Sequence, residues 1–330
     1  MAFHKEITMI LRAVCLLALA CVTAWSQTAH AQAYPSKPIS IITITLPGAT
    51  SETLIKTVSE RAGEALHQKI IIDPKPGAGG TIAAVAFKLA KPDVYTLFFA
   101  SSQNISQDPV LRTDLPFDPV KDFQPLTLVA NSLSFLFVPG SSPARSIPEL
   151  IALAKTKPGG LAYASIGTLS DLMSGVIRLG SKVPLESIQY KGGPAVMPDL
   201  LTGRIDFFIT SLPTAASFLP DGRRRALAAA APQRSELLPN VPTFTEGGIP
   251  LTHSFSWFGL FAPAGTPDAI VRQLHREFLR AVNDTDVRRK LVPTGYLMEA
   301  SESPEDFVRW IAADRSRIEK LVKELGIKAN

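Results

Sequence analysis

The sequence predicts an α/β fold divided into two domains. Between residues 39 and 263, short runs rich in β-branched residues alternate with longer stretches of helical period, which is the pattern of a parallel sheet covered by helices. After Pro263 the period is helical only. Removing a 33-residue signal peptide from the 330-residue chain leaves 297 residues. That length exceeds what one hydrophobic core usually serves, so two domains are expected.

Residues 1–33 have the composition of a secretory signal peptide. Lys5 and Arg12 precede an apolar run, AVCLLALACVTAW, and the small-residue sequence AHAQA follows it. Cleavage after Ala31 or Ala33 satisfies the A-x-A pattern, and we expect Ala33, which makes Tyr34 the first mature residue. The apolar run is short for a membrane span, so the mature protein is expected to be exported and soluble.

Both cysteines, Cys15 and Cys21, lie in this segment, so neither disulfides nor thiol catalysis are expected in the mature chain. Cys21 would be the lipid acceptor of a lipoprotein, an alternative disfavoured because Ala18 stands where such signals have leucine.

Charge argues against a nucleic-acid-binding protein. Removing the signal peptide lowers the formal net charge from +5 to +4, which is a mild excess, and few aromatic residues interleave with the basic ones. The one basic cluster, Arg223–Arg225, follows the turn sequence PDG and is interpreted as a solvated turn.

The elements follow in chain order. Strands are predicted at residues 39–45, 69–73, 95–101, 126–130, 133–139, 161–165, 186–190, 205–210, 225–231 and 257–263. Helices are predicted between them at 53–67, 81–91, 146–157, 171–181 and 195–203, and after them at 268–284, 286–292 and 304–325. We expect the late helices to pack back on the first domain, which the second domain then interrupts.

Ligands of open parallel sheets bind beyond the carboxyl ends of the strands, where loops lead into helices. The first such loop reads TLPGATSETLIK (45–56). Its helix start offers unpaired N–H groups and a partial positive charge to a carboxylate or phosphate, although an ordinary capped turn is the alternative. The candidate residues of this loop are Leu46, Pro47, Gly48, Ala49, Thr50, Ser51 and Glu52.

The second loop, PKPGAGGTIAA (74–84), does not match a nucleotide-binding motif. The dinucleotide pattern requires glycine or alanine where Ile82 stands, and no Gly-Lys-Ser/Thr follows for a phosphate loop. The N–H groups of Gly79, Gly80 and Thr81 are candidates for contact with a solute; alternatively, the glycines only let the helix start close to the first loop.

Two later loops carry hydroxyl groups at strand ends. The loop YASIGTLSDLMSG (163–175) places small and hydroxyl residues before a helix, and the strand at 205–210 ends in two hydroxyls, with a simple strand-exit turn as the alternative. The candidate residues of these two loops are Ser165, Gly167, Thr168, Ser170, Asp171, Thr210 and Ser211. The ends of the strands at 95–101 and 186–190 add the candidates Ser101, Ser102 and Tyr190.

Catalytic motifs are missing, so no enzyme, metal or cofactor is predicted. The mature histidines are His67, His253 and His275; no pair has metal-ligand spacing, and there is no G-x-S-x-G elbow. His67 and His275 lie in predicted helices among charged residues and are interpreted as solvated surface. A triad assembled in space from distant residues stays open at this point.

Ten segments in order resemble the Bug family, the extracytoplasmic receptors of tripartite tricarboxylate transporters. They are YPSKPI, PGAGG, PDVYTL, LPFDPVKDF (115–123), AYAS, QYKGGPA (189–195), DLLTGRID (199–206), RALA, PNVPTFTEGGIP (239–250) and SWFGLFAPAGTP (256–267). Together they span the mature chain.

The resemblance implies a type II periplasmic binding protein, in which two α/β domains close over a carboxylate-bearing solute. It implies domain I at 34–133 and 253–330 and domain II at 134–252. The carboxylate would be held by N–H groups and hydroxyls of two facing loops, Leu46–Glu52 and Ser165–Asp171. The expected partners are a small organic anion and the membrane subunits of the transporter, with no nucleic acid, and the protein is expected to be a monomer in the periplasm.

The chain departs from the family pattern at several positions. Leu46, Ala49 and Glu52 replace Pro, Gly and Asp of the usual first loop; Asp171, Thr210 with Ser211, and Val94 also differ, and the second loop is about two residues short. Ala49 reaches positive φ less freely than glycine, and Glu52 extends one methylene further into any cleft. These changes leave the identity of the solute open, including whether it carries an ammonium group.

Two other hypotheses remain. The same fold could serve a periplasmic sensor or partner protein whose ligand state is read by a signalling protein. An exported hydrolase would need a nucleophile such as Ser165, and the missing motif parts weigh against it.

Overall fold

The computed structural model describes residues 34–216, 223–251 and 256–327. The predicted signal peptide and His253 lie outside these ranges. In chain order the strands are β1 (Ile39–Thr43), β2 (Ile70–Pro74), β3 (Thr96–Ser101), β4 (Phe123–Ser132), β5 (Ser134–Pro139), β6 (Leu161–Ser165), β7 (Leu185–Gln189), β8 (Phe207–Ser211), β9 (Arg224–Ala229), β10 (Trp257–Pro263) and β11 (Tyr296–Met298). Every predicted strand is present, with ends shifted by a few residues.

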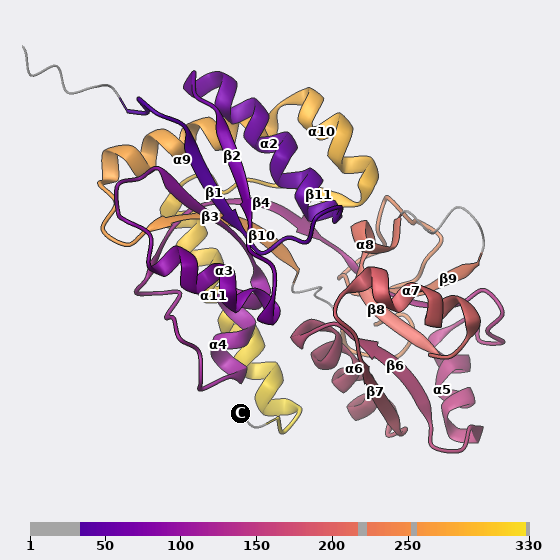
Figure 1. Cartoon of the computed structure of the whole chain (residues 1–330). Coiled ribbons are helices and arrows are strands. Elements are labelled where there is room, and N and C mark those ends of the chain that lie inside the picture. The colour runs from indigo at the N-terminus through magenta and orange to yellow at the C-terminus, as the bar shows by residue number, and fades with distance from the viewer. Residues whose placement is uncertain (1–33, 217–222, 252–255, 328–330) are drawn as a thin grey trace, which may run out of the picture. The chain divides into compact units, whose positions relative to one another are not determined.

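The strands form two sheets. The six-stranded sheet has the order β11-β4-β10-β3-β1-β2, and the five-stranded sheet has the order β7-β6-β8-β5-β9 (Figure 1). We call each sheet with the helices that cover it the six-stranded lobe and the five-stranded lobe. Both belong to one compact unit that begins at Lys37.

The prediction of parallel sheets is wrong in part, because both sheets are mixed. In the six-stranded sheet β1 pairs in parallel with β2 and β3, whereas β10 runs antiparallel to β3 and β4. In the five-stranded sheet β6 is parallel to β7 and β8, whereas β5 runs antiparallel to β8 and β9. β5 enters the five-stranded sheet directly from β4 of the other sheet, and β10 enters the six-stranded sheet after β9 of the other sheet. Neither strand follows a strand of its own sheet through a crossover helix, which is the connection that makes neighbours parallel.

The helices follow in chain order. They are α2 (Thr50–Leu66), α3 (Thr81–Lys88), α4 (Asp108–Leu111), α5 (Ile147–Thr156), α6 (Thr168–Ser181), α7 (Gly193–Thr202), α8 (Leu212–Ala216), α9 (Asp268–Asn283), α10 (Thr285–Leu291) and α11 (Pro304–Glu324). Short 3-10 turns occupy Ala78–Gly80 and Val292–Thr294, and a π-helical turn occupies Gln103–Gln107.

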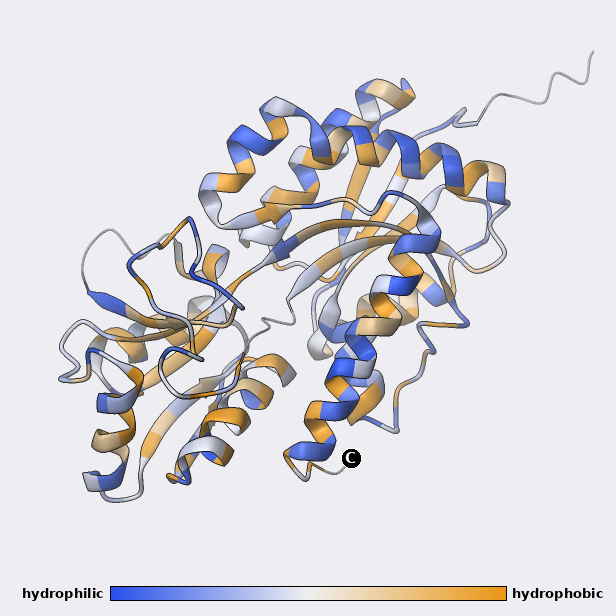
Figure 2. Ribbon diagram, turned by 180° about the vertical axis from the view of Figure 1, so that it is seen from behind, coloured by the Kyte–Doolittle hydropathy of each residue, from blue (hydrophilic) through white to orange (hydrophobic). Residues whose placement is uncertain are grey.

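Helices cover both faces of each sheet, which explains why the strands are apolar on both sides. Figure 1 shows α2, α9 and α10 on one face of the six-stranded sheet and α3 and α11 on the other. Along β5, Leu136 and Val138 join the cluster formed with α5 and α6, while Phe135 and Phe137 join the cluster formed with α7. This alternation follows from the two-residue period of a strand. The apolar colouring of the strands and the polar outer faces of the helices are visible in Figure 2.

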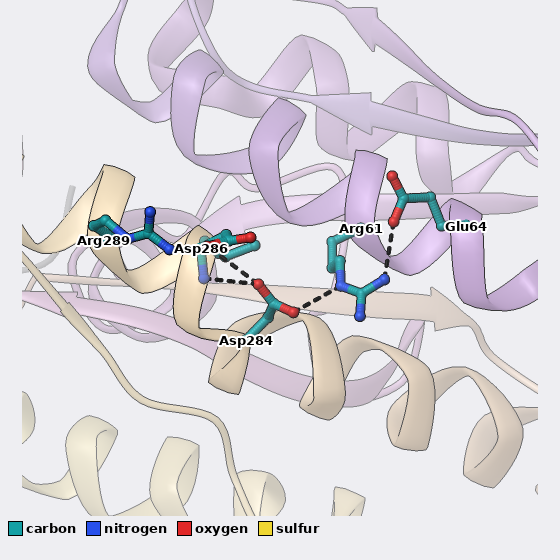
Figure 3. A network of polar contacts seen from close by, with 6 residues as sticks. Arg61, Glu64, Asp284, Asp286 and Arg289 are labelled. Atoms are coloured by element: carbon teal, nitrogen blue, oxygen red, sulfur yellow. Dashed lines mark hydrogen bonds and ion pairs between the residues drawn. The ribbon is translucent and has the colours of Figure 1, made fainter.

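Arg61 ties α2 to the junction of α9 and α10 (Figure 3). Its Nε lies 2.7 Å from Asp284 Oδ2, and its other end pairs with Glu64. Asp284 also caps α10 by accepting from the N–H groups of Asp286 and Val287. The hydrogen bond from Arg61 is the main reason that the pKa of Asp284 is lowered. Since these groups are solvent-exposed, the contact orients the helices more than it stabilises them.

Helix α11 packs into the cores of both lobes. Phe307 and Ile311, in its N-terminal half, join the aromatic cluster around the six-stranded sheet. Ile318 and Val322, in its C-terminal half, join the cluster that contains α5 and α6 of the five-stranded lobe. The late helices were expected to pack back on the first domain, and this helix also packs against the five-stranded lobe.

Three further expectations are corrected by the structure. The chain after Pro263 is not purely helical, because β11 pairs antiparallel with β4 at the sheet edge. His275 is buried, and its Nε2 lies 3.0 Å from the carbonyl oxygen of Ser301. Arg224 and Arg225 lie in β9 instead of a solvated turn, and Arg225 donates to the carbonyls of residues 140, 142 and 144. A guanidinium has five N–H donors, so it can order a loop of bare carbonyls.

The packing of α11 gives a stability prediction. Ile318→Ala is expected to lower the free energy of unfolding by about 2–4 kcal/mol, because it empties part of the core of the five-stranded lobe. Val308→Ala on the same helix is the control, since that side chain is 50% exposed, and it should cost less than about 0.5 kcal/mol. Urea unfolding at equilibrium measures both. A cost below about 1 kcal/mol for Ile318→Ala would contradict the assigned packing.

Candidate functional site

Two adjoining cavities lie between the lobes, with volumes of about 180 and 370 Å³. Five residues line both of them: Ser101, Ile166, Ser211, Thr214 and Phe258. We therefore treat them as one space, the cleft. Its walls are the ends of β1, β3 and β8 and the starts of α2, α6 and α7, which is where the rule for α/β sheets places ligands.

Much of the predicted site lines the cleft. The smaller cavity contains Ser101, Ser102, Gly167, Ser170, Thr210 and Ser211, and the larger one contains Leu46, Gly48, Ala49, Thr50 and Ser51. The structure thus brings together candidates that are up to 165 positions apart, from Leu46 to Ser211. That any of them contacts a solute stays a prediction.

Three helices start at the cleft without a side-chain cap. The N-cap residues are Ala49 for α2, Gly167 for α6 and Gly192 for α7, and none of them caps its helix with a side chain. In contrast, α5 and α11 start away from the cleft and are capped by Ser146 and Ser303. The first turn of a helix leaves N–H groups without intrahelical partners. These bare helix starts give the cleft a partial positive potential.

Ala49 does not need the positive φ that glycine would supply. Its φ is −73° and its ψ is 151°, an extended conformation open to any residue, while Gly48 takes the left-handed turn with φ +79°. The replacement of glycine at position 49 is therefore compatible with the loop.

Glu52 turns away from the cleft. Its carboxylate accepts the Gly48 N–H at 2.6 Å and pairs with Lys56 at 2.7 Å. The hydrogen bond from Lys56, followed by the one from Gly48, lowers the pKa of Glu52. The expectation that Glu52 reaches further into the cleft is therefore wrong, because its extra methylene lets it close the loop on itself. Pro47 does not line the cleft either.

Gly79, Gly80 and Thr81 lie behind the wall instead of lining it. A Cβ at Gly80 would lie 2.5 Å from Asn104 Nδ2 and 2.9 Å from Ile44 Cγ2, and Asn104 donates to the carbonyl of Gly79 at 2.7 Å. Arg112 lies 3.4 Å from the Thr81 hydroxyl. The geometry favours the second interpretation of this loop: the glycines let the helix start close to the end of β1 and to the π-helical turn.

Asp171 is held on the far side of α6. Its carboxylate accepts hydrogen bonds from three hydroxyls, those of Ser165 at 2.8 Å, Tyr163 at 3.0 Å and Ser187 at 3.3 Å. It lines a separate hollow of about 140 Å³ that also contains Arg178. Ser165 therefore donates its hydroxyl to Asp171, and neither side chain lines the cleft.

Tyr190 likewise lies outside the cleft. Its hydroxyl donates to Asp199 at 2.6 Å, and burial, together with that carboxylate, raises its pKa to about 12. This contact anchors the strand end after β7 to α7.

Thr168 does not line the cleft but links the two lobes. It donates from its hydroxyl to Asp108 Oδ1 at 3.1 Å. Asp108 is 2% exposed and belongs to α4, on the other side of the cleft. Burial raises the pKa of Asp108 to about 6, against the opposing effects of Thr168, Arg112 and Gln103.

The sequence did not suggest five of the residues in the cleft wall: Gln103, Gln107, Thr214, Phe258 and Tyr296. Gln103 and Gln107 come from the π-helical turn, whose residues follow no helical or strand period. Phe258 follows the buried Trp257, so the alternation of the strand could have placed it on the opposite face. Tyr296 lies on a three-residue strand too short to be recognised.

The cleft is electrically neutral at the level of side chains. Over the described residues, neither cavity is lined by a charged group. No cluster of three metal-ligating side chains occurs in the ranges that the structure describes. None of the helices described there has the length and apolarity needed to cross a bilayer. The wall offers hydroxyls, side-chain amides and N–H groups, which can donate to an anion without a formal positive charge.

Comparison with known proteins places this architecture in a family. The model described as "Tripartite tricarboxylate transporter family receptor" matches residues 54–327. The chain belongs to this family. Protein BugT of Bordetella pertussis is 29% identical over 90% of this chain and 92% of its own length, so the resemblance to Bug receptors is confirmed.

Solved structures of similar receptors share the fold. The R. palustris protein Rpa4515, solved with adipate, is 28% identical, with a TM-score of 0.83 over 89% of this chain and 99% of its own. MatC of Rhodopseudomonas palustris, solved with malate, is 27% identical, with a TM-score of 0.78 over 88% of this chain and 100% of its own. The predicted fold of a type II periplasmic binding protein is therefore confirmed for this receptor.

Gly79 gives a test of how the second loop acts. Gly79→Ala should destabilise the receptor by about 1 kcal/mol, because the residue has a positive φ of +63° and its new Cβ would lie 3.1 Å from Gln103 Nε2. Gly203→Ala is the matched control, because Gly203 also has a positive φ, +74°, but an added Cβ there would meet no other atom within 4 Å. Thermal unfolding should show a similar loss in both. Only Gly79→Ala should also change the affinity for a solute. If both variants bound the solute as tightly as the wild type, the loop would not act through Gln103.

Asp108 gives a pH-dependent stability prediction without any solute. Since burial raises its pKa from 3.8 to about 6, the folded state binds a proton more tightly than the unfolded state, and this contribution to stability is lost as pH rises from about 4 through about 6. Asp108→Asn keeps the shape and removes the charge. It should raise the free energy of unfolding by about 1–3 kcal/mol at about pH 8, with the gain vanishing below about pH 4. A gain independent of pH would contradict the assignment.

Proposed function

We propose that this receptor is a periplasmic solute-binding protein that captures a small carboxylate in the cleft and delivers it to the membrane subunits of a tripartite tricarboxylate transporter. It acts without catalysis and as a monomer. The observation that carries the proposal is the convergence of three uncapped helix starts, those of α2, α6 and α7, on a cleft lined by hydroxyls. The family membership supports the transport role.

Donors on opposite walls suit a carboxylate held between the lobes. Thr50 and Ser51 belong to the first turn of α2, and Gly167 precedes the first turn of α6. A hydrogen bond to a charged group contributes about 1.5–3 kcal/mol net. Three or four such bonds reach the roughly 8 kcal/mol of a micromolar complex before the cost of closure is subtracted. The cleft can therefore bind an anion without lysine or arginine.

We further propose that the lobes are the two domains expected from the resemblance, 34–133 with 253–330 and 134–252, and that they close over the solute. The strands at the boundary support this. The N–H of Ser132, at the end of β4, donates to the carbonyl of Ser256, so the two crossing connections lie side by side. A predicted signal peptide and the periplasmic location named for similar structures support export.

A panel of mono-, di- and tricarboxylates and amino acids, including adipate and malate, tests the proposal by thermal shift and calorimetry. At least one carboxylate is expected to bind with 1:1 stoichiometry and without turnover. If no compound in the panel gave a thermal shift or a heat of binding, carboxylate capture by this chain would be refuted. Native mass spectrometry of protein purified gently from periplasm would identify a solute that the panel omits.

Ser101 and Ser211 line both cavities, so their hydroxyls are expected to contact the solute. Ser101→Ala and Ser211→Ala should each weaken the binding of the best panel ligand by about 3–10-fold, the value of one hydrogen bond. Thr202→Ala is the control, because that hydroxyl is exposed on α7 and donates to Pro198 and Asp199 carbonyls. Calorimetry that found all three variants equal to the wild type would place the solute elsewhere.

A further inference from the structure

Asp108 stands behind the cleft and connects two of its walls. It is buried at the start of α4, directly after the π-helical turn. Its carboxylate accepts a hydrogen bond from the hydroxyl of Thr168, the first residue of α6, and the side chain of Gln103 lies near enough to favour its ionised form. Gln103 lines the smaller cavity. One buried carboxylate thus lies beside a group from each lobe.

The charged groups around Asp108 leave it without a dedicated counter-ion. Arg112, at the end of α4, acts on it through its charge, but the guanidinium makes two hydrogen bonds to Asp114, at 3.0 and 3.2 Å. On α11, Arg315 donates to the carbonyl of Ile105. On α6, Asp171 is occupied by three hydroxyls. Unpaired buried carboxylates are costly to ionise, and this is why the pKa of Asp108 rises to about 6.

The side-chain amide of Gln103 is confined between two glycines. A Cβ at Gly79 would lie 3.1 Å from its Nε2, and a Cβ at Gly167 would lie 2.9 Å from its Oε1. An ionised Asp108 can only accept hydrogen bonds, so it favours the orientation in which the amide N–H of Gln103 points to it. The carbonyl oxygen of Gln103 is then the atom nearest the start of α6. A solute carboxylate at that helix start would meet an oxygen instead of a donor.

A proton on Asp108 reverses this arrangement. The neutral carboxyl can donate its O–H to Gln103 Oε1 while its other oxygen still accepts from Thr168. The amide then turns its N–H groups toward the cleft, and the negative charge behind the wall is gone. The exchange needs only a proton from solvent, and the number of hydrogen bonds at Asp108 is unchanged.

We propose that Asp108 is a positioning residue for the solute, and that an anionic solute binds to this receptor with uptake of one proton at Asp108. The inference rests on the proposed function, because it assigns a role to the same cleft. It makes capture most efficient in mildly acidic surroundings, and it couples release of the solute to release of a proton.

Calorimetry with adipate and malate as probes tests the inference. Between about pH 8 and pH 6.5 ordinary carboxylic acids stay ionised, so changes in affinity report on the protein. The affinity of the wild type should rise about tenfold over this range. Titrations at about pH 7 in two buffers of different ionisation enthalpy should show uptake approaching one proton per solute.

Three variants separate positioning from a merely structural role. Asp108→Asn imitates the protonated carboxyl, so it should bind at about pH 8 as tightly as the wild type does at about pH 6.5, with no proton uptake. Thr168→Val removes a donor that favours the ionised form, so it should keep proton uptake and move the affinity change to higher pH. Asp268→Asn, an exposed carboxylate on α9, is the matched control and should behave as the wild type.

The outcomes distinguish this inference from the proposed function. A probe that binds the wild type with flat affinity and no proton uptake would overturn the inference alone. An unchanged pH profile in a folded Asp108→Asn would also overturn the inference. If Asp108→Asn does not fold, the inference is tested by the pH profile of Thr168→Val. If neither these probes nor any other acid in the panel bound at any pH, the proposed function would fail and the inference with it.

Discussion

The cleft depends on helix starts that are left without caps. A side-chain cap typically contributes about 1 kcal/mol, and α2, α6 and α7 do without it. Packing holds these helices instead: Leu54, Ile55 and Val58 of α2 are fully buried. Because burial of one such side chain contributes about 1.5–3 kcal/mol, the apolar faces readily offset the missing caps. No side chain of the N-cap residues then competes with a ligand for the N–H groups of the first turns.

A neutral cleft also requires that nearby carboxylates be kept from it. Each acidic residue of the two loops is occupied by the protein itself, Glu52 by Gly48 and Lys56, and Asp171 by three hydroxyls. Carboxylates with such partners do not need a solute ammonium to satisfy them. The departures from the family pattern at these two positions therefore change the support of the loops more than the chemistry of the cleft wall.

Sequence reasoning found the elements and the loops but could not place individual side chains. Strand positions followed from β-branched runs, and the loops at the cleft followed from the rule on strand ends. The direction of Glu52 depends on one methylene and one backbone N–H, which no pattern encodes. The π-helical turn was missed because its hydrogen bonds skip five residues and leave no periodic signal. His275 looked exposed among charged neighbours, yet α9 turns it toward Ser301.

The π-helical turn and α11 connect the cleft to the cores of both lobes. Gln103 and Gln107 of the turn line the cleft, while Arg315 of α11 donates to the carbonyl of Ile105 in the same turn. The C-terminal half of α11 is in turn packed against α6 through Gly175, where an added Cβ would lie 3.1 Å from Leu325. A shift of the five-stranded lobe would therefore act on α11 and, through Arg315, on the wall that holds Gln103. Contiguous packing would therefore couple the proposed closure to the orientation of this amide, and Asp108 lies at the end of the same turn.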